Sequence, residues 1–147
     1  MKNFSEIIDR VKSVKPFILS VAAAEDKELL LAIKRASDMG FIKPILVGDK
    51  EKIHAIAKEI DLRPYDIVAG EIPEDSAAKA VSLVKSGNAQ VLMKGLVNTS
   101  VYMRAILNKE KGLRTGRLIS MLAVYELPQY HKLLFCTDSG INVSPDL

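Results

Sequence analysis

The sequence has 147 residues, 48% of them apolar and 27% charged, with a net charge of +3, which suits one globular domain. It contains no apolar run of the ~20 residues that a membrane helix needs, no signal-peptide core and no basic block of the kind that binds nucleic acid. Its single cysteine, Cys136, excludes an intramolecular disulfide and a cysteine-based metal cluster, so we expect a cytoplasmic protein.

Hydrophobic periodicity predicts helices and strands that alternate as far as residue 107. A first helix over 4–14 ends before Pro16, which cannot continue it. Four strand–helix units follow, each with a short apolar run and then apolar residues at helical spacing. The predicted strands are 16–22, 45–47, 66–69 and 91–93, and the predicted helices are 25–40, 49–60, 75–86 and one that opens at 98–100.

This alternation predicts an α/β fold. Parallel strands joined through helices form a sheet with helices on both faces, so we expect a three-layer sandwich with a mostly parallel sheet. We expect strand 91–93 to lie inside that sheet. After a basic loop at 109–117, two further strands are predicted at 118–125 and 131–136. Their short connection favours an antiparallel pair.

The stretch 91–100 is the strongest candidate for a binding site. Lys94 and Gly95 follow a predicted strand, and Asn98-Thr99-Ser100 opens a helix. Ligands of α/β sheets bind where strands end, and the N–H groups and dipole of a helix start attract anions. An ordinary capped turn with a solvated lysine would give the same pattern.

Positive charge is concentrated in and after this stretch. Arginine pairs bidentately with phosphate oxygens, so the cluster favours a phosphate-rich ligand, although a solvated loop is an equal alternative. Further on, Asp138 follows a strand and Asn142 comes four residues later, a spacing that is also common in turns. The basic residues of the cluster are Lys94, Arg104, Lys109, Lys111, Arg114 and Arg117.

Other familiar signatures are absent from the sequence. There is no phosphate loop, no glycine-rich dinucleotide turn and no nucleophile elbow. His54 and His131 lack the spacing of metal ligands, and we expect the first to be solvated and the second to be structural.

Taken in order, the segments resemble the phosphate acetyl/butyryl transferase family. Ser139 departs from the family pattern, which has a smaller residue such as Ala or Gly there, and family members are about twice as long as this chain. The segments that carry the resemblance are 17–24, 45–49, 92–95, 102–104 and 134–147.

The resemblance implies acyl transfer between coenzyme A and inorganic phosphate, with no metal and with coenzyme A as a substrate. It implies a fold like that of isocitrate and isopropylmalate dehydrogenases, in which two α/β domains flank a cleft. It also implies that the protein is an oligomer. Residues 1–147 would be the N-terminal domain, without the family's serine–arginine pair, so no catalytic residue is assigned. The implied substrate-binding residues are Lys94, Gly95, Thr99, Arg104, Arg114, Asp138 and Asn142.

Two alternatives stay open at this point. One is an NAD(P)-dependent dehydrogenase-like relative, although no ribose-binding acid follows a glycine turn. The other is a truncated, non-catalytic domain that binds a ligand or partner. If the chain is part of an acyltransferase, we expect it alone to show little or no turnover and to keep weak affinity for phosphate or coenzyme A.

Overall fold

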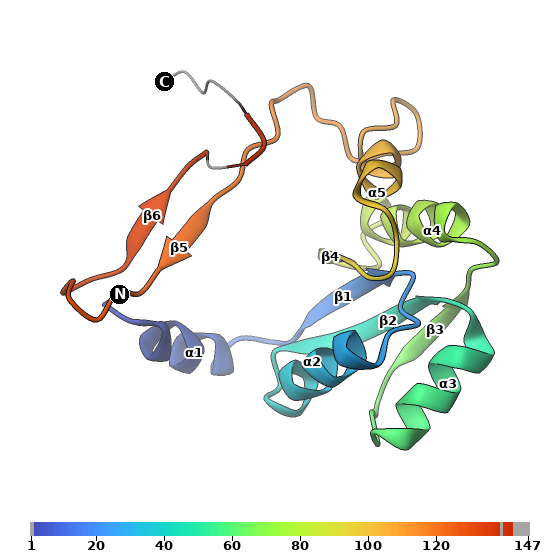
Figure 1. Cartoon of the computed structure of the whole chain (residues 1–147), viewed down its shortest axis with the longest axis horizontal. Helices are drawn as coiled ribbons and strands as arrows, with labels where there is room; N and C mark the ends of the chain where they lie inside the picture. The colour runs from blue at the N-terminus through green and yellow to red at the C-terminus, as the bar shows by residue number, and fades with distance from the viewer. Residues whose placement is uncertain (1, 139, 143–147) are drawn as a thin grey trace. The chain divides into compact units, whose positions relative to one another are not determined.

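The computed structural model describes residues 2–138 and 140–142, and the chain forms two compact units. The central unit comprises residues 15–114, and the terminal unit comprises 1–14 together with 115–147. The parallel sheet lies entirely within the central unit (Figure 1).

The central unit is built on a four-stranded parallel sheet. Its strand order is β3-β2-β1-β4, and all three pairings are parallel, which confirms the mostly parallel sheet expected from the strand–helix alternation. Val21 at the middle of the sheet lies opposite Leu46 on one side and Met93 on the other. The strands are β1 (Phe17–Ala22), β2 (Ile42–Gly48), β3 (Asp66–Ala69) and β4 (Val91–Lys94).

The prediction that strand 91–93 lies inside the sheet is wrong. In the described part of the chain, β4 pairs only with β1, and Val91 is 40% exposed. The two strands predicted after residue 117 do not extend the sheet, because they pair with each other. A short connection closes two strands into a local antiparallel pair, whereas a parallel pairing needs a long crossover.

Helices cover both faces of the sheet, which gives the three layers that were expected. On one face, Leu19 and Leu46 pack with Ile33 and Ile53 in one core cluster. On the other face, a second cluster joins β1 and β2 to the helices α4 and α5. The first face carries α2 (Lys27–Asp38) and α3 (Lys50–Glu59), and the second carries α4 (Pro73–Lys85) and α5 (Thr99–Ile106) (Figure 1).

Side-chain caps set the start of three of these helices. Asp26 accepts a hydrogen bond from the Leu29 N–H, Asp49 caps α3 and Asn98 caps α5, because the first amides of a helix have no intrahelical acceptor. The fourth helix begins at Pro73 instead of the predicted 75, since proline at the first helical position loses no hydrogen bond.

The terminal unit contains α1 (Phe4–Lys12) and a hairpin of β5 (Ala123–Tyr125) and β6 (Leu134–Cys136). The hairpin is antiparallel, as predicted, but each strand is shorter than predicted. The Phe4 N–H donates to the Glu126 carboxylate at 2.7 Å, which ties α1 to the hairpin. None of the helices in the described residues is both long enough and apolar enough to cross a bilayer.

Candidate functional site

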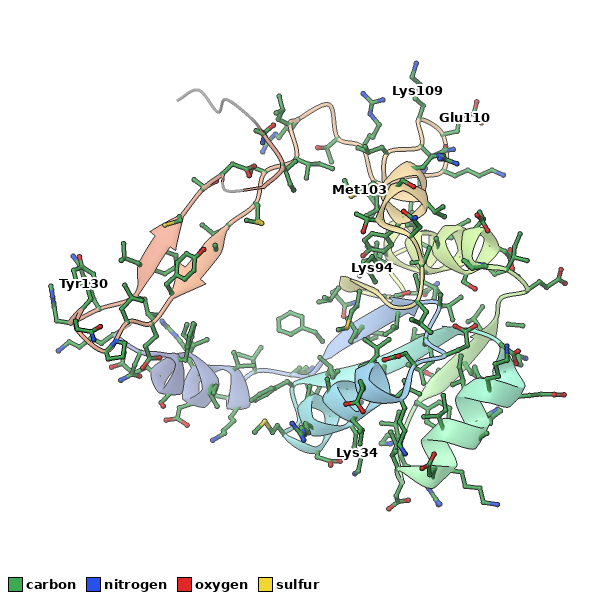
Figure 2. The ribbon with its side chains drawn as sticks, in the orientation of Figure 1. Lys34, Lys94, Met103, Lys109, Glu110 and Tyr130 are labelled. Carbon is green, nitrogen blue, oxygen red and sulfur yellow. The ribbon has the colours of Figure 1, made fainter. Side chains whose placement is uncertain are left out.

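Lys94 ends β4 at the carboxyl edge of the sheet, where the chain turns into α5 (Figure 2). Its ammonium donates to the Val97 carbonyl at 2.8 Å and to the Gly95 carbonyl at 3.2 Å. These bonds hold the side chain over the short loop that precedes α5. An ammonium has three protons, so one donor remains for a ligand.

Gly95 lies where the chain passes close to the end of β1. Its N–H donates to the Ala22 carbonyl at 2.8 Å. A Cβ atom at this position would lie 2.1 Å from the Ala23 carbonyl oxygen, which is far inside a normal contact. Approach of the chain's own backbone is therefore enough to require glycine here, and no ligand is needed to explain it.

Thr99 is the first residue of α5 and is exposed at the helix start. The preceding Asn98 side chain accepts hydrogen bonds from the Ser100 N–H and the Ser100 hydroxyl, both at 3.0 Å. The cap satisfies one amide, and the other first-turn amides keep the partial positive charge of a helix amino end.

Arg104 and Arg114 lie near the other end of α5. Arg104 is in its last turn, five residues after Thr99, which places it ~140° around the axis and ~7.5 Å along it. The Leu113 N–H donates to the Ile106 carbonyl at 2.8 Å, so Arg114 follows a contact with the carboxyl end of this helix. Lys94 and Thr99 therefore lie at the amino end of α5, and the two arginines at its carboxyl end.

The cations of this region have no carboxylate partners among the residues that the structure describes. In the described part of the chain, Lys94, Arg104 and Arg114 form no salt bridge. Glu110 is the only acidic residue between 94 and 114, and it lies with Lys109 on the loop beyond α5, away from Lys94 (Figure 2). The central unit thus presents unneutralised positive charge at both ends of α5.

Tyr102 is the ionisable side chain that α5 turns inward. It packs against the core cluster beneath α4 and α5, and this burial raises the pKa of its phenol. The group therefore stays neutral near pH 7 and adds no negative charge to the basic region.

Asp138 and Asn142 belong to the terminal unit. The Asp138 carboxylate accepts hydrogen bonds from the N–H groups of Ile141, Gly140 and Met121, each at 2.9 Å. The Asn142 amide adds a fourth bond at 2.7 Å. These donors, chiefly Ile141 and then Gly140, hold the pKa of the Asp138 carboxyl well below its usual range. A carboxylate has about four acceptor sites, and these four donors fill them. Asp138 therefore links the residues that follow it to Met121 and has little capacity left for a ligand.

The remaining positions singled out from the sequence are the C-terminal residues and the two histidines. Ser139 and residues 143–147, which include part of the expected site edge, lie outside the described residues. His54 is exposed, as expected, but it also bonds to the Tyr65 hydroxyl at 2.6 Å. His131 precedes β6 instead of starting it, and it lies against the Tyr130 ring.

Sequence reasoning missed Glu25, which it placed only at a helix start. Its carboxylate accepts a hydrogen bond from the Asp49 N–H at 2.5 Å and lies against Gly48, so it joins the loops after β1 and β2. No local pattern marks such a contact, because its partners are 23 and 24 residues away (48 − 25 and 49 − 25). The described residues contain no group of three His, Cys, Asp or Glu side chains that could hold a metal ion.

Comparison with known families identifies the chain. A family model described as phosphate acetyl/butaryl transferase matches residues 65–147, which is more than half of the sequence. The chain belongs to the phosphate acetyl/butaryl transferase family. This confirms the resemblance found from the ordered segments.

Relatives within the phosphate acetyl/butaryl transferase family match the whole chain. It is 46% identical over 147 residues to phosphate butyryltransferase of Clostridium beijerinckii, covering 99% of this chain and 49% of that protein. It is 44% identical to phosphate butyryltransferase of Clostridium acetobutylicum, covering 100% of this chain and 50% of that protein. The chain thus spans about half the length of these relatives.

A solved structure shows a similar fold. A branched-chain phosphotransacylase from Enterococcus faecalis V583 matches with a TM-score of 0.72 and 27% identity. The match covers 88% of this chain and 45% of that one. The α/β layers described above are therefore shared with a phosphotransacylase.

Proposed function

We propose that this chain supplies one side of the substrate site of a phosphate acyltransferase. The reaction moves an acyl group, butyryl by preference, between coenzyme A and inorganic phosphate. The observation that carries the proposal is the 46% identity over 147 residues to a phosphate butyryltransferase. Similarity to phosphotransacylases favours this function over the dehydrogenase alternative.

The charges of the central unit suit these substrates. Coenzyme A, phosphate and the acyl phosphate are all anions, and the cations at the ends of α5 have no carboxylate partners in the described part of the chain. We assign Lys94 and Thr99 to phosphate oxygens at the helix start, and Arg104 and Arg114 to the more distant phosphates of coenzyme A. Fixed cations also stabilise the oxyanion that forms when thiolate or phosphate attacks the acyl carbonyl.

The other candidate residues act through the backbone in this proposal. Gly95 allows the loop before α5 to lie against β1, which positions Lys94. Asp138 accepts hydrogen bonds from the Gly140 N–H and from the Asn142 side chain, and so positions these two residues. We also propose that the complete protein has two α/β domains in the manner of isocitrate and isopropylmalate dehydrogenases, with the acyl transfer in the cleft between them.

A binding experiment tests the assignment of residues. Titration calorimetry of the purified chain with coenzyme A should give weak, saturable binding, and the Lys94→Ala, Arg104→Ala double variant should weaken it roughly tenfold, since charge-assisted hydrogen bonds are lost. The matched control is Lys34→Ala, Arg35→Ala on α2, which removes the same charge from the opposite face of the sheet (Figure 2). Equal losses in both variants would show that only net charge matters.

An activity assay tests whether this chain catalyses acyl transfer by itself. We expect the chain alone to form little or no butyryl phosphate from butyryl-coenzyme A and phosphate, because orientation and oxyanion stabilisation need groups from both sides of a cleft. A full-length relative from Clostridium beijerinckii serves as the positive control. Robust turnover by the 147-residue chain would contradict the one-sided site.

A further inference from the structure

A pocket of about 350 Å³ lies at the end of α3. Ala57 and Leu62, each only 1% exposed, close it at the core, and the partly buried ring of Tyr65 forms its apolar wall. Its rim carries polar and charged side chains. The rim residues are His54, Lys58, Arg63 and Tyr65.

This pocket is separate from the candidate substrate site. Tyr65 directly precedes β3, so the pocket lies at the amino edge of the parallel sheet. Lys94 ends β4 at the carboxyl edge. Figure 1 shows the connection from α3 into β3 at the tail of the β3 arrow, whereas ligands of such sheets usually bind at the arrowheads.

The charge around the pocket is positive. Two of the six lining residues, Lys58 and Arg63, are cations, and none is a carboxylate. Arg63 pairs with Asp61 at 3.3 Å, but both side chains are 79% exposed, so solvent screens this pair. Lys58 has no salt bridge among the described residues. The negative end of the α3 dipole accounts for Lys58 in the last turn of that helix, but not for Arg63, which lies beyond it.

The geometry of the pocket is held by short-range contacts. His54 Nδ1 and the Tyr65 hydroxyl share a hydrogen bond of 2.6 Å, which links α3 to the segment before β3. Lys58 follows His54 by four residues, so both lie on the same face of the helix. The Leu62 N–H donates to the Ala57 carbonyl at 2.9 Å and fixes the turn that leads to Arg63.

We propose that this pocket binds an organic phosphate monoester. Arg63 offers a planar fork of donors that matches two phosphate oxygens, and Lys58 adds a compact positive charge. The partly exposed ring of Tyr65 provides an apolar surface for the organic part of the molecule. A bare phosphate ion would contact the cations alone and leave this ring uncovered.

Phenyl phosphate is a suitable probe, and two-dimensional NMR of the isotope-labelled chain can monitor its binding. We expect saturable shifts of the amides between 54 and 65 and weaker binding of both inorganic phosphate and phenol. The Lys58→Gln, Arg63→Gln variant should weaken binding at least about tenfold. The control, Lys50→Gln with Lys52→Gln, removes two charges from the first turn of the same helix and should leave the affinity within about twofold.

Several results would overturn the proposal. Shifts confined to the residues around Lys94 and Arg104 would assign the binding to the substrate site instead. Equal losses in the pocket variant and its control would reduce the effect to net charge. Inorganic phosphate binding as tightly as phenyl phosphate would show that the Tyr65 ring takes no part in binding. The Lys94→Ala, Arg104→Ala variant should retain phenyl phosphate binding, which separates this proposal from that of the acyltransferase site.

Discussion

A Cβ atom on Gly95 would lie 2.1 Å from the carbonyl oxygen of Ala23. The second contact, 2.7 Å to the Ala22 carbonyl, is with backbone as well. Backbone atoms at the end of a buried strand cannot move aside as a flexible side chain can. The contact makes residue 95 a sensitive position for the whole carboxyl edge of the sheet.

Gly95→Ala should therefore destabilise the central unit by ~1–3 kcal/mol, the usual cost of forcing extra atoms into a packed site. The measurement is urea denaturation followed by circular dichroism. Gly140→Ala is the control, because a Cβ there would meet only the Met121 side chain, at 3.5 Å and beyond. Equal stability of the two variants would contradict the backbone contact.

Leu46→Ala tests the core on the α2 and α3 face. Leu46 is completely buried in the middle of β2, and its truncation should cost ~2–5 kcal/mol through lost burial and a residual cavity. The exposed Leu96, on the loop before α5, is the matched position for a control Leu→Ala change. The free energy of unfolding should change little in that control, and a similar loss at both positions would argue against the core assignment.

Asp138 should make the stability of the chain depend on pH. Its pKa is lowered in the folded chain, whereas the unfolded carboxyl titrates near the ordinary value of ~4. The carboxylate therefore stabilises the fold above about pH 4, and this contribution is lost as the pH falls toward the folded pKa. Asp138→Asn should lower the urea midpoint most near neutral pH, with a gap that narrows on acidification.

The Asn142→Ala variant measures one part of the stabilisation that Asp138 provides. It removes one of the four donors and leaves the three backbone donors in place. Its loss of stability should be smaller than that of Asp138→Asn.

The pH dependence of Asp138→Asn gives the contradicting outcome. A difference in urea midpoint between wild type and Asp138→Asn that stays constant from about pH 6 to about pH 3 would show that the hydrogen bonds to the ionised carboxylate do not stabilise the fold.

Exposed apolar residues of the terminal unit should promote self-association. Leu118, Leu122 and Phe135 are 81%, 64% and 55% exposed, and apolar surface of this kind favours contact with another chain. Leu122→Lys with Phe135→Lys should shift sedimentation toward the monomer. Met39→Lys with Ile72→Lys adds the same charge at two exposed positions of the central unit and should leave association unchanged. A chain that is monomeric at every concentration would refute this prediction.

Local patterns predicted most of the fold. The strands at 66–69 and 91–93 and the helix that opens at 98–100 are where the sequence places them, because alternation and helical spacing act between residues a few positions apart. The order of the segments also identified the family. The position of β4 at the sheet edge did not follow from these patterns, because a strand's neighbours depend on the rest of the chain.

The sequence by itself determined the α/β alternation, the positive charge of residues 94–117 and the family. The tertiary structure alone decided that Gly95 faces the backbone of Ala23 and that the Asp138 carboxylate accepts its hydrogen bonds from the chain itself. It alone brought His54 to the Tyr65 hydroxyl beside a basic pocket. The physical reason is that periodicity and capping are set by neighbours along the chain, whereas these contacts exist only once strands, helices and loops have packed together.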